Sequence, residues 1–378
     1  MPKKKSAPKA GRLSMADMRA LVNKKAGQEV AHDLKESNPT EVTQWIPTGC
    51  RWLDSIICRG RLAGLPVGKV VEIAGLEGTG KSYMAVQSAA NAQKMGMDVI
   101  YFDSEAAVDP GFLEASGCDL DKLLYVQATS VEMVFETIEE LLATNDNQML
   151  FILDSLANTP CEADLETDFN PQRTMAMKPR ILSKVFRKIT TPLANKNCTL
   201  LILNQLKTNI TSNVAEAMVN PYFTPGGKGP AYAYSLRIWL TGRKSKASFI
   251  LDDRGFQIGS EVKAKIKKSR FGSLHRECTY KIIWAGGEAK IMDEDSWFTA
   301  IKHSEHLNQR GAWYSIKFAD GSEKKFQAAN WSEMLKDEKF KQRVFEIMDE
   351  EVILKFERQE GDASNFFDID GDKTLTEE

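Results

Sequence analysis

The stretch Gly75-Leu76-Glu77-Gly78-Thr79-Gly80-Lys81-Ser82 fits the pattern G-x-x-x-x-G-K-[ST] of a phosphate-binding loop. The apolar run before it, residues 69–74, predicts a buried strand, and residues 82–94, rich in Ala, Met and Gln, predict a helix. Backbone N–H groups and the positive end of the helix dipole can then cradle a polyphosphate. Lys81 would meet the β- and γ-phosphates, and the Ser82 hydroxyl would ligate Mg²⁺. A glycine-rich turn that binds nothing is the alternative, and the strand–loop–helix context argues against it.

Composition sets the limits for the rest of the chain. Its 378 residues allow two or three domains, or one large domain with appendages, and 42% hydrophobic residues can bury a sizeable core. No apolar run approaches the roughly 20 residues of a membrane span, and the basic N-terminus lacks the apolar segment of a secretory signal. Six scattered cysteines without a C-x-x-C pair, and only four histidines, predict reduced thiols in a cytosolic protein, without a disulfide frame or zinc site.

Apolar strands alternate with helices between residues 69 and 245, which predicts an α/β fold with a mostly parallel, doubly wound sheet. The expected strands are 98–102, 123–126, 149–153 and 199–203, and the expected helices are 131–143 and 175–195. After residue 233, strands at 236–240, 261–266 and 278–284 follow without helices between them, as in antiparallel strands that extend the sheet. Helices at 295–303 and 333–356 then surround an extended piece, 313–318.

Both ends of the chain differ from its centre. Residues 1–12 carry five positive charges and no acid, which suits an arm that touches phosphates or a solvated tail, and residues 15–35 have helical spacing. The tail from residue 357 has a net charge of −6. Its run Asp368–Asp372 resembles the start of a calcium loop, but Lys373 stands where such a loop needs Gly. We therefore expect four regions: 1–44, an arm with a small helical appendage; 45–290, an ATPase core; 291–356, a small α/β region; and 357–378, an acidic disordered tail.

Three predicted strands end in polar residues, and ligands bind at such carboxyl ends in open α/β sheets. The strand 99–102 leads into Asp103-Ser104-Glu105, where Glu105 can reach the water that attacks a γ-phosphate. The strand 149–153 ends in Asp154, the Walker B pattern that holds Mg²⁺. The strand 199–203 ends in Asn204-Gln205, whose amide can bond the γ-phosphate and report its loss. Each could instead be a polar strand end facing solvent, but together with a phosphate loop they support one site.

Two long segments leave this edge of the sheet, residues 159–173 and 207–228, and loops of this length are usually functional or disordered. The polar groups of the second, among them Lys207, Asn209 and Lys228, suit contacts to a nucleic-acid backbone. A basic cluster follows at 263–276, with Lys263, Lys265 and Lys267 expected on one strand face, together with Lys268, Arg270 and Arg276. It could complete an ATP site on a neighbouring subunit, or it could be a charged edge strand that prevents aggregation.

In order and spacing, these motifs resemble the RecA family of homologous-recombination ATPases, and among them phage recombinases of the UvsX type, over residues 45–290. The resemblance implies a RecA-like P-loop core that binds ATP and Mg²⁺, with the nucleotide held by residues 75–82 and Tyr83. It implies that Glu105 is the catalytic base, assisted by Lys81 and Gln205, and that Ser82 and Asp154 hold the metal. Asp109 would contact the adenine and Phe112 would stack on it, while Lys267, Lys268 and Arg270 would act across the subunit interface.

The same resemblance assigns DNA contacts to the two loops and to a neighbouring helix. These contacts are Arg173, Arg180, Arg187, Lys207, Asn209, Gly226, Gly227 and Lys228. The N-terminal appendage and the part from Asp295 onward match the family less well, which leaves the polymerisation contacts and the second-strand DNA site open.

The expected function is ATP-dependent DNA strand exchange by a filament on single-stranded DNA, with homologous duplex DNA as the second substrate. The resemblance also leaves room for a single-strand-binding protein and a recombination mediator as partners. It implies no membrane, and a location in the bacterial cytoplasm, or in the host cytoplasm if the chain is phage-encoded. One alternative is a hexameric replicative helicase, for which about 45 residues before the core are few. Another alternative is an ATP-gated scaffold, but the two long loops favour contact with DNA over such a role.

Overall fold

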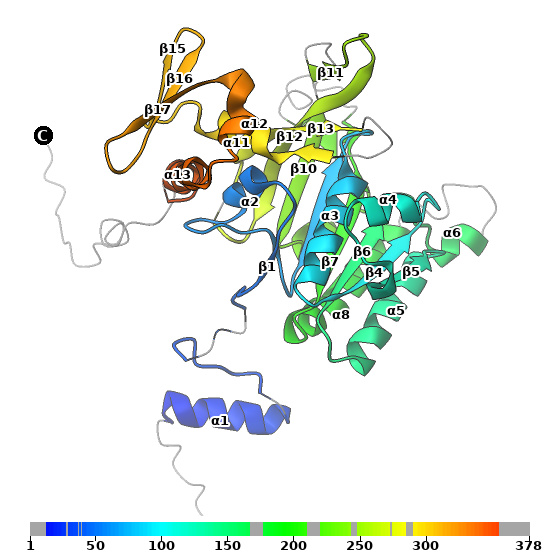
Figure 1. Ribbon diagram of the computed structural model, residues 1–378. Helices are drawn as coiled ribbons and strands as arrows, with labels where there is room; N and C mark the ends of the chain where they lie inside the picture. Colours follow the sequence, from blue (N-terminus) through cyan, green and yellow to red (C-terminus); the bar gives the residue numbers. More distant parts are fainter. Residues whose placement is uncertain are drawn as a thin grey trace, which may run out of the picture. The chain divides into compact units, whose positions relative to one another are not determined.

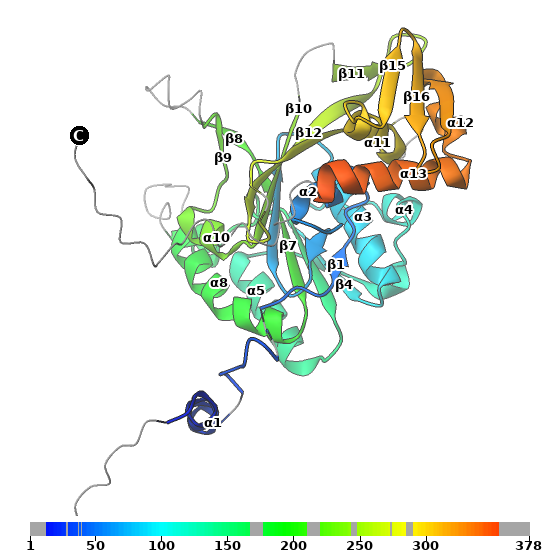
Figure 2. The same cartoon turned by 90° about the vertical axis from the view of Figure 1, so that its left-hand side faces the viewer.

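The computed structural model describes residues 13–27, 29–36, 38, 40–166, 177–209, 220–242, 248–272, 274–284 and 290–354 (Figures 1 and 2). They belong to two compact units, Met1–Thr43 and Gln44–Glu378. The expected acidic tail and the arm at residues 1–12 lie outside the described residues, and so does Arg173. The four-region division stays a prediction.

The first unit contains helix α1 (Met15–Ala26). Ser14 and Asp17 form a capping box at its start, and Gly27, with φ of 68°, ends it in the left-handed conformation. The expectation of a helix as far as residue 35 is therefore wrong beyond Ala26. Instead, the Asn23 side chain bonds the backbone of Val30 and Ala31, which folds the chain back.

The second unit is built on a sheet with the strand order β14-β13-β12-β10-β3-β7-β6-β4-β5. Its parallel part comprises β10 (Leu236–Gly242), β3 (Val70–Gly75), β7 (Thr199–Gln205), β6 (Met149–Asp154), β4 (Asp98–Asp103) and β5 (Leu123–Gln127). The predicted doubly wound α/β core is thus confirmed. Because parallel strands run the same way, their carboxyl ends meet at one edge of the sheet.

Helices cover both faces of this sheet (Figures 1 and 2). Alternate strand residues face opposite sides. One face, including Val71, Ile73 and Leu201, packs with α3 (Lys81–Lys94) and α2 (Arg51–Ile57). The other face packs with α5 (Val131–Thr144) and α8 (Met177–Asn195), whose Phe135 and Phe186 rings meet edge to face at 5.3 Å.

Helix α8 tolerates two prolines. Pro179 lies in the first turn, where its missing N–H has no intrahelical acceptor, and Pro192 lies near the end. Shorter elements complete this part of the unit. They are β1 (Trp45–Ile46), β2 (Leu65–Pro66), α4 (Pro110–Ala115), a 3₁₀ turn (Leu120–Lys122) and α6 (Glu162–Glu166).

Antiparallel strands extend the sheet beyond β10, as expected. They are β12 (Gln257–Ser269), β13 (Glu277–Ile283) and β14 (Lys290–Met292), with β11 (Phe249–Leu251) paired to β12. One expectation is wrong: β10 itself pairs in parallel with β3 and follows a short helix, α10 (Lys228–Ala233). The alternative of a charged edge strand also fails, because β12 lies between β10 and β13.

The C-terminal region combines a three-stranded antiparallel sheet with short helices. The sheet comprises β15 (Leu307–Arg310), β16 (Trp313–Lys317) and β17 (Glu323–Gln327), and the helices are α11 (Asp293–Ile301), α12 (Trp331–Met334) and α13 (Glu338–Met348), which continues into a π-helical turn (Asp349–Ile353). The single helix expected over 333–356 is broken because the Asp337 side chain caps a new start, accepting bonds from the N–H groups of Lys339 and Phe340. Among the described residues no helix is long and apolar enough to cross a membrane.

Candidate functional site

The phosphate loop connects β3 to α3. Gly80 has φ of 77°, a backbone conformation that favours glycine, and a Cβ there would also displace the end of the Ile282 side chain, at 2.5 Å. Thr79 Oγ1 and Lys81 Nζ both donate to the Leu76 carbonyl, at 2.7 and 3.0 Å. The predicted strand–loop–helix context is therefore present, with the ammonium group folded over the loop.

Strand register brings the predicted polar ends together. Gln205 lies opposite Gly75 in the β3–β7 pair, and Asp103 lies opposite Asp154 in the β4–β6 pair. Asp154 Oδ2 accepts hydrogen bonds from Ser82 Oγ and Tyr101 OH, both at 2.8 Å. Ser82 and Asp154, the two residues expected to hold a metal, are thus in direct contact.

The carboxylates at this edge are close to one another. Burial raises the pKa of Asp154 most strongly, Glu105 and Asp103 raise it further, and the two hydroxyls oppose them. Burial lowers the pKa of Lys81, whereas Asp154, Glu105 and Glu77 act in the opposite direction. Negative charge therefore surrounds Lys81, and a divalent cation beside Asp154 would relieve the repulsion.

Glu105 is held by two donors from the segment after β6. Its Oε1 accepts from Ser155 Oγ at 2.9 Å and from Asn158 Nδ2 at 2.6 Å. The backbone of its turn is pinned by the buried carboxylate of Asp103, which accepts from the N–H groups of Glu105, Ala107 and Val108 at 2.8 to 3.2 Å. The exposed carboxylate of Glu105 is thus oriented on the same side as Asp154.

The residues expected around the adenine lie beside α3. Asp109 caps α4 by accepting from the Gly111 N–H at 2.9 Å. The half-buried Phe112 ring lies 6.1 Å from the Tyr83 ring. The structure therefore brings Tyr83 and Phe112 together, and their contact with a base stays a prediction.

The described ends of the second long segment, residues 207–209 and 220–228, contain regular structure. Its two ends pair as a short hairpin, β8 (Lys207–Thr208) with β9 (Tyr222–Phe223). Asn209 extends this stem, because its N–H donates to the Pro221 carbonyl and its side chain to the Asn220 carbonyl. Lys207 is exposed on β8, and Lys228, also exposed, opens α10.

The glycine pair after the hairpin packs on α8. Gly226 and Gly227 have φ of 106° and 81°, and a Cβ on Gly227 would lie 3.2 Å from Pro179 Cβ. Arg180 and Arg187 are exposed on this helix, and Arg187 Nε donates to the Ser183 carbonyl at 2.9 Å. These predicted DNA contacts therefore lie on two elements that touch each other, the hairpin return and α8.

The basic cluster at 263–276 divides into groups with different surroundings. A β-bulge at Lys267 interrupts the β10–β12 pairing, and Lys267 Nζ lies 4.5 Å from the Trp239 ring centre. Lys268 and Arg270 both donate to the Tyr232 carbonyl at the end of α10, at 3.1 and 2.9 Å. Burial first, then Arg270 and Arg237, lower the pKa of Lys268 to about 8.

Two further members of the cluster contact other strands or regions of the unit. Lys263 forms an ion pair with Glu277 at 2.6 Å, and Arg276 donates to the Val352 carbonyl in the C-terminal region. Lys263, Lys265 and Lys267 do alternate with buried residues along β12, as predicted. The role of the cluster at a neighbouring subunit stays a prediction.

Several residues that support the site were missed from sequence. Tyr101 bonds the carboxylate of Asp154, and Ser155 and Asn158 bond that of Glu105. Lys178 donates to three carbonyls of the segment after β6, those of Leu156, Ala157 and Thr159. The contact of Tyr101 with Asp154 depends on strand register, because it forms only when β4 pairs with β6.

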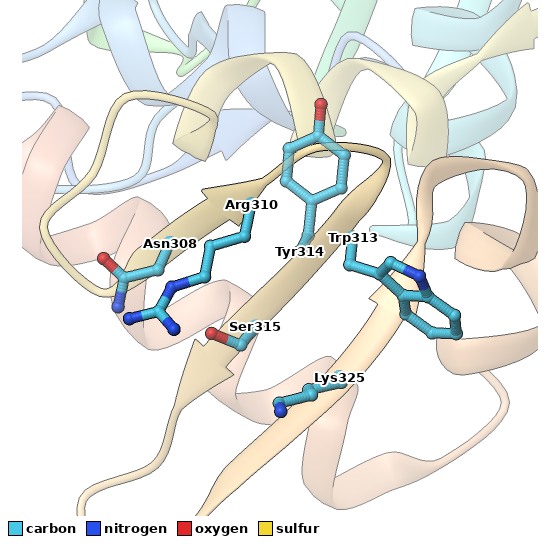
Figure 3. A pocket seen from close by; sticks show the side chains of 6 residues that line it. All are labelled: Asn308, Arg310, Trp313, Tyr314, Ser315 and Lys325. Carbon is cyan, nitrogen blue, oxygen red and sulfur yellow. The ribbon is translucent and has the colours of Figure 1, made fainter.

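A separate hollow of about 350 Å³ lies on the three-stranded sheet of the C-terminal region (Figure 3). Asn308, Arg310, Trp313, Tyr314, Ser315 and Lys325 line it. None of the residues singled out in the sequence lies in it. This hollow is therefore distinct from the nucleotide site.

A phosphate loop after β3, an acid at the end of β6 and a held glutamate just after β4 define an ATPase of the P-loop class with a RecA-like core. The model of the RecA N-terminal domain matches residues 14–289. The chain is 28% identical over 330 residues to Protein RecA of Mannheimia haemolytica, spanning 87% of this chain and 85% of that protein. Protein RecA of Trichodesmium erythraeum is 30% identical over 264 residues, 69% of each chain. Protein RecA of Haemophilus ducreyi is 26% identical to this chain over 365 residues, which span 95% of this chain and 93% of that protein.

The chain belongs to the RecA family. It is a RecA-type recombinase and a DNA-dependent ATPase, and the helicase alternative is not favoured. The predicted family, fold class and activity are confirmed. The greater closeness to the UvsX-type phage recombinases stays a prediction.

Proposed function

We propose that ATP binds in the phosphate loop and that Glu105 is the general base for its hydrolysis. The contact that supports this most directly is the bond between Ser82 Oγ and Asp154 Oδ2 at 2.8 Å, because it joins the phosphate loop to the acidic strand end. Glu105 would accept a proton from the attacking water, while Lys81 would neutralise phosphate charge. Asp109 and Phe112, with Tyr83, would bind the base.

Ser82 and Asp154 would hold Mg²⁺. A hydroxyl and a carboxylate are oxygen ligands of the kind that this ion prefers. Burial first, and then the neighbouring carboxylates, raise the pKa of Asp154, and a bound cation would act in the opposite direction. Bound Mg²⁺ would neutralise charge on the phosphates. The protein groups would orient the nucleotide and the water.

The hairpin after β7 and the exposed arginines of α8 would contact single-stranded DNA. The position of Gln205 supports a link to the nucleotide. Gln205 lies opposite Gly75, and the hairpin begins two residues after it, at Lys207. A bond from its amide to the γ-phosphate would hold the outgoing hairpin strand. Lys267, Lys268 and Arg270 would reach the nucleotide of an adjoining subunit in a filament, and homologous duplex DNA would be the exchange partner.

The test is a titration of labelled single-stranded DNA with ADP and with a non-hydrolysable ATP analogue. Loss of one charge-assisted hydrogen bond corresponds to about 1.5–3 kcal/mol, or roughly 10- to 150-fold in affinity. Gln205→Ala should keep ATP binding and lose most of the ATP-induced gain in DNA affinity. Gln127→Ala, at the end of β5, is the matched control and should behave as wild type. A full nucleotide-dependent gain in Gln205→Ala would refute the switch and move the coupling to the subunit interface.

A further inference from the structure

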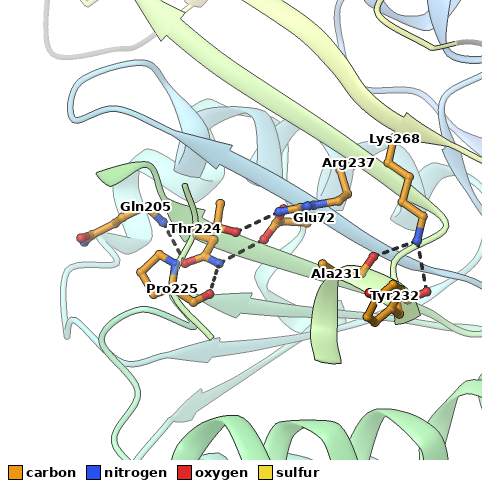
Figure 4. A network of polar contacts seen from close by, with 9 residues as sticks. Glu72, Gln205, Thr224, Pro225, Ala231, Tyr232, Arg237 and Lys268 are labelled. Carbon is orange, nitrogen blue, oxygen red and sulfur yellow. Dashed lines mark hydrogen bonds and ion pairs between the residues drawn. The ribbon is translucent and has the colours of Figure 1, made fainter. Parts of the chain in front are cut away.

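A buried polar network lies beneath the return strand of the hairpin (Figure 4). Its centre is Glu72 on β3, which is fully buried three residues before the phosphate loop begins. Arg237 Nε on β10 donates to Glu72 Oε2 at 2.6 Å, and Asn204 Nδ2 on β7 donates to Glu72 Oε1 at 3.1 Å. A buried carboxylate requires such partners, and both of its oxygens have one.

The same two donors also reach the chain that returns from the hairpin. Arg237 Nη2 donates to Thr224 Oγ1 at 2.8 Å, and Asn204 Nδ2 donates to the Pro225 carbonyl at 3.2 Å. Thr224 and Pro225 immediately follow β9 and precede the glycine pair that packs on α8. The guanidinium fork therefore joins the strand of the phosphate loop to the hairpin return.

Apolar contacts strengthen this attachment on the phosphate-loop side. Ala74, Leu206 and Trp239 form a small buried cluster, against which Leu76 of the phosphate loop and Tyr222 of β9 pack. The hairpin stem is thus bonded through Thr224 and packed through Tyr222.

We infer that Glu72 and Arg237 are positioning residues for DNA binding: they hold the hairpin return at a fixed place on the sheet. This rests on the proposed role of the hairpin as a DNA contact. Arg237 does not touch DNA or nucleotide in this scheme. It acts through Thr224, because its planar fork bonds Glu72 and the hydroxyl at the same time.

Arg237→Lys is the informative substitution. Lysine keeps the positive charge that Glu72 needs, so the buried carboxylate is not left unpaired, but one ammonium cannot reproduce the fork geometry. Thr224→Val removes the hydroxyl and keeps the shape of the side chain, whereas Thr224→Ser keeps the hydroxyl. Arg343→Lys is the control, because Arg343 is an equally buried fork in the C-terminal region, bonded to the Lys317 carbonyl and Glu346.

The measurement is single-stranded DNA affinity with a non-hydrolysable ATP analogue, beside nucleotide affinity and thermal midpoint. Arg237→Lys and Thr224→Val should each weaken DNA binding on the order of 10-fold, with nucleotide affinity kept. The double variant should be no weaker than either single variant, because both remove the same contact. Thr224→Ser and Arg343→Lys should bind as wild type.

DNA affinity within twofold of wild type in both single variants would overturn the inference, as would additive losses in the double variant or an equal loss in Arg343→Lys. A Lys207→Ala/Lys228→Ala variant separates this inference from the proposed function. If that variant binds DNA as wild type, the hairpin is not a DNA contact and both fail. If it loses affinity while Arg237→Lys does not, only the positioning role is wrong.

Discussion

Glu105→Gln is the substitution that tests the catalytic assignment with least disturbance of the structure. Glu105 Oε1 accepts from Ser155 Oγ and Asn158 Nδ2, and a glutamine carbonyl can accept the same two bonds. The turn is fixed independently, since Asp103 binds its backbone N–H groups. The change therefore removes the proton acceptor and leaves the geometry of the loop.

The magnitude follows from this separation. A positioned general base contributes about 10²- to 10⁴-fold, which is about 2.7 to 5.4 kcal/mol of activation free energy. We expect kcat for DNA-stimulated ATP hydrolysis to fall by about 10²-fold or more, with ATP affinity within twofold of wild type. Because the ATP state is proposed to bind single-stranded DNA more tightly than the ADP state, slower hydrolysis should also keep the variant on single-stranded DNA longer.

The assay is steady-state phosphate release at saturating single-stranded DNA, together with binding of a fluorescent ATP analogue. Glu114→Gln, an exposed glutamate on α4, is the matched control for the loss of one negative charge. Hydrolysis by Glu105→Gln at the wild-type rate would show that the base lies elsewhere. A fall in ATP affinity equal to the fall in kcat would instead identify Glu105 as a residue that shapes the pocket.

Three further changes test other parts of the site. Lys81→Ala should abolish nucleotide-dependent filaments in electron micrographs, because the phosphate charge loses its partner. Lys94→Ala, at the other end of α3, is the control and should still form filaments. Unchanged ATP affinity in Lys81→Ala would contradict the phosphate-loop assignment. Deleting residues 357–378, with a net charge of −6, should strengthen duplex DNA binding and lower its Mg²⁺ requirement, and equal affinities across a salt series would contradict this. Raising the pH from 7 to 9 should weaken ATP-dependent assembly, because the pKa of Lys268 is about 8, below its ordinary 10.5, and the residue loses its charge in this window. The folded chain binds this proton less tightly than the unfolded chain, so this group makes folding more favourable as pH rises from about 8 to 10.5, and its titration does not itself unfold the chain. Lys268→Arg should flatten the pH profile, and a profile unchanged from wild type would exclude Lys268.

Local patterns were enough to predict the phosphate loop, the parallel core and the three polar strand ends. Each is written in neighbouring residues: Gly80-Lys81-Ser82 after an apolar run, or Asp154 after residues 149–153. The partners of these residues were not predictable, because they come from distant parts of the chain. Tyr101 meets Asp154 only through the pairing of β4 with β6, and Arg237 meets Glu72 only because β10 lies beside β3. The partners of the basic cluster were not predictable for the same reason, since the bulge at Lys267 and the bond from Arg276 to the Val352 carbonyl depend on tertiary packing.

Two adjacent residues at the end of β7, Asn204 and Gln205, have different roles in this scheme. Successive strand residues point to opposite faces. The Asn204 amide bonds Glu72 in the buried network, whereas the Gln205 side chain points away from it (Figure 4). Asn204 holds the return strand of the hairpin through Pro225, and Gln205 lies two residues before the outgoing strand β8. A nucleotide that bonds Gln205 would therefore move or hold only the outgoing strand, against a return strand fixed by Glu72 and Arg237. If the network holds the return strand in place during this change, Arg237→Lys should have two effects. It should lower the DNA affinity, and it should reduce the difference in DNA affinity between the ATP analogue and ADP. A variant that weakens both nucleotide states equally would instead show that the network supports the hairpin without taking part in the coupling.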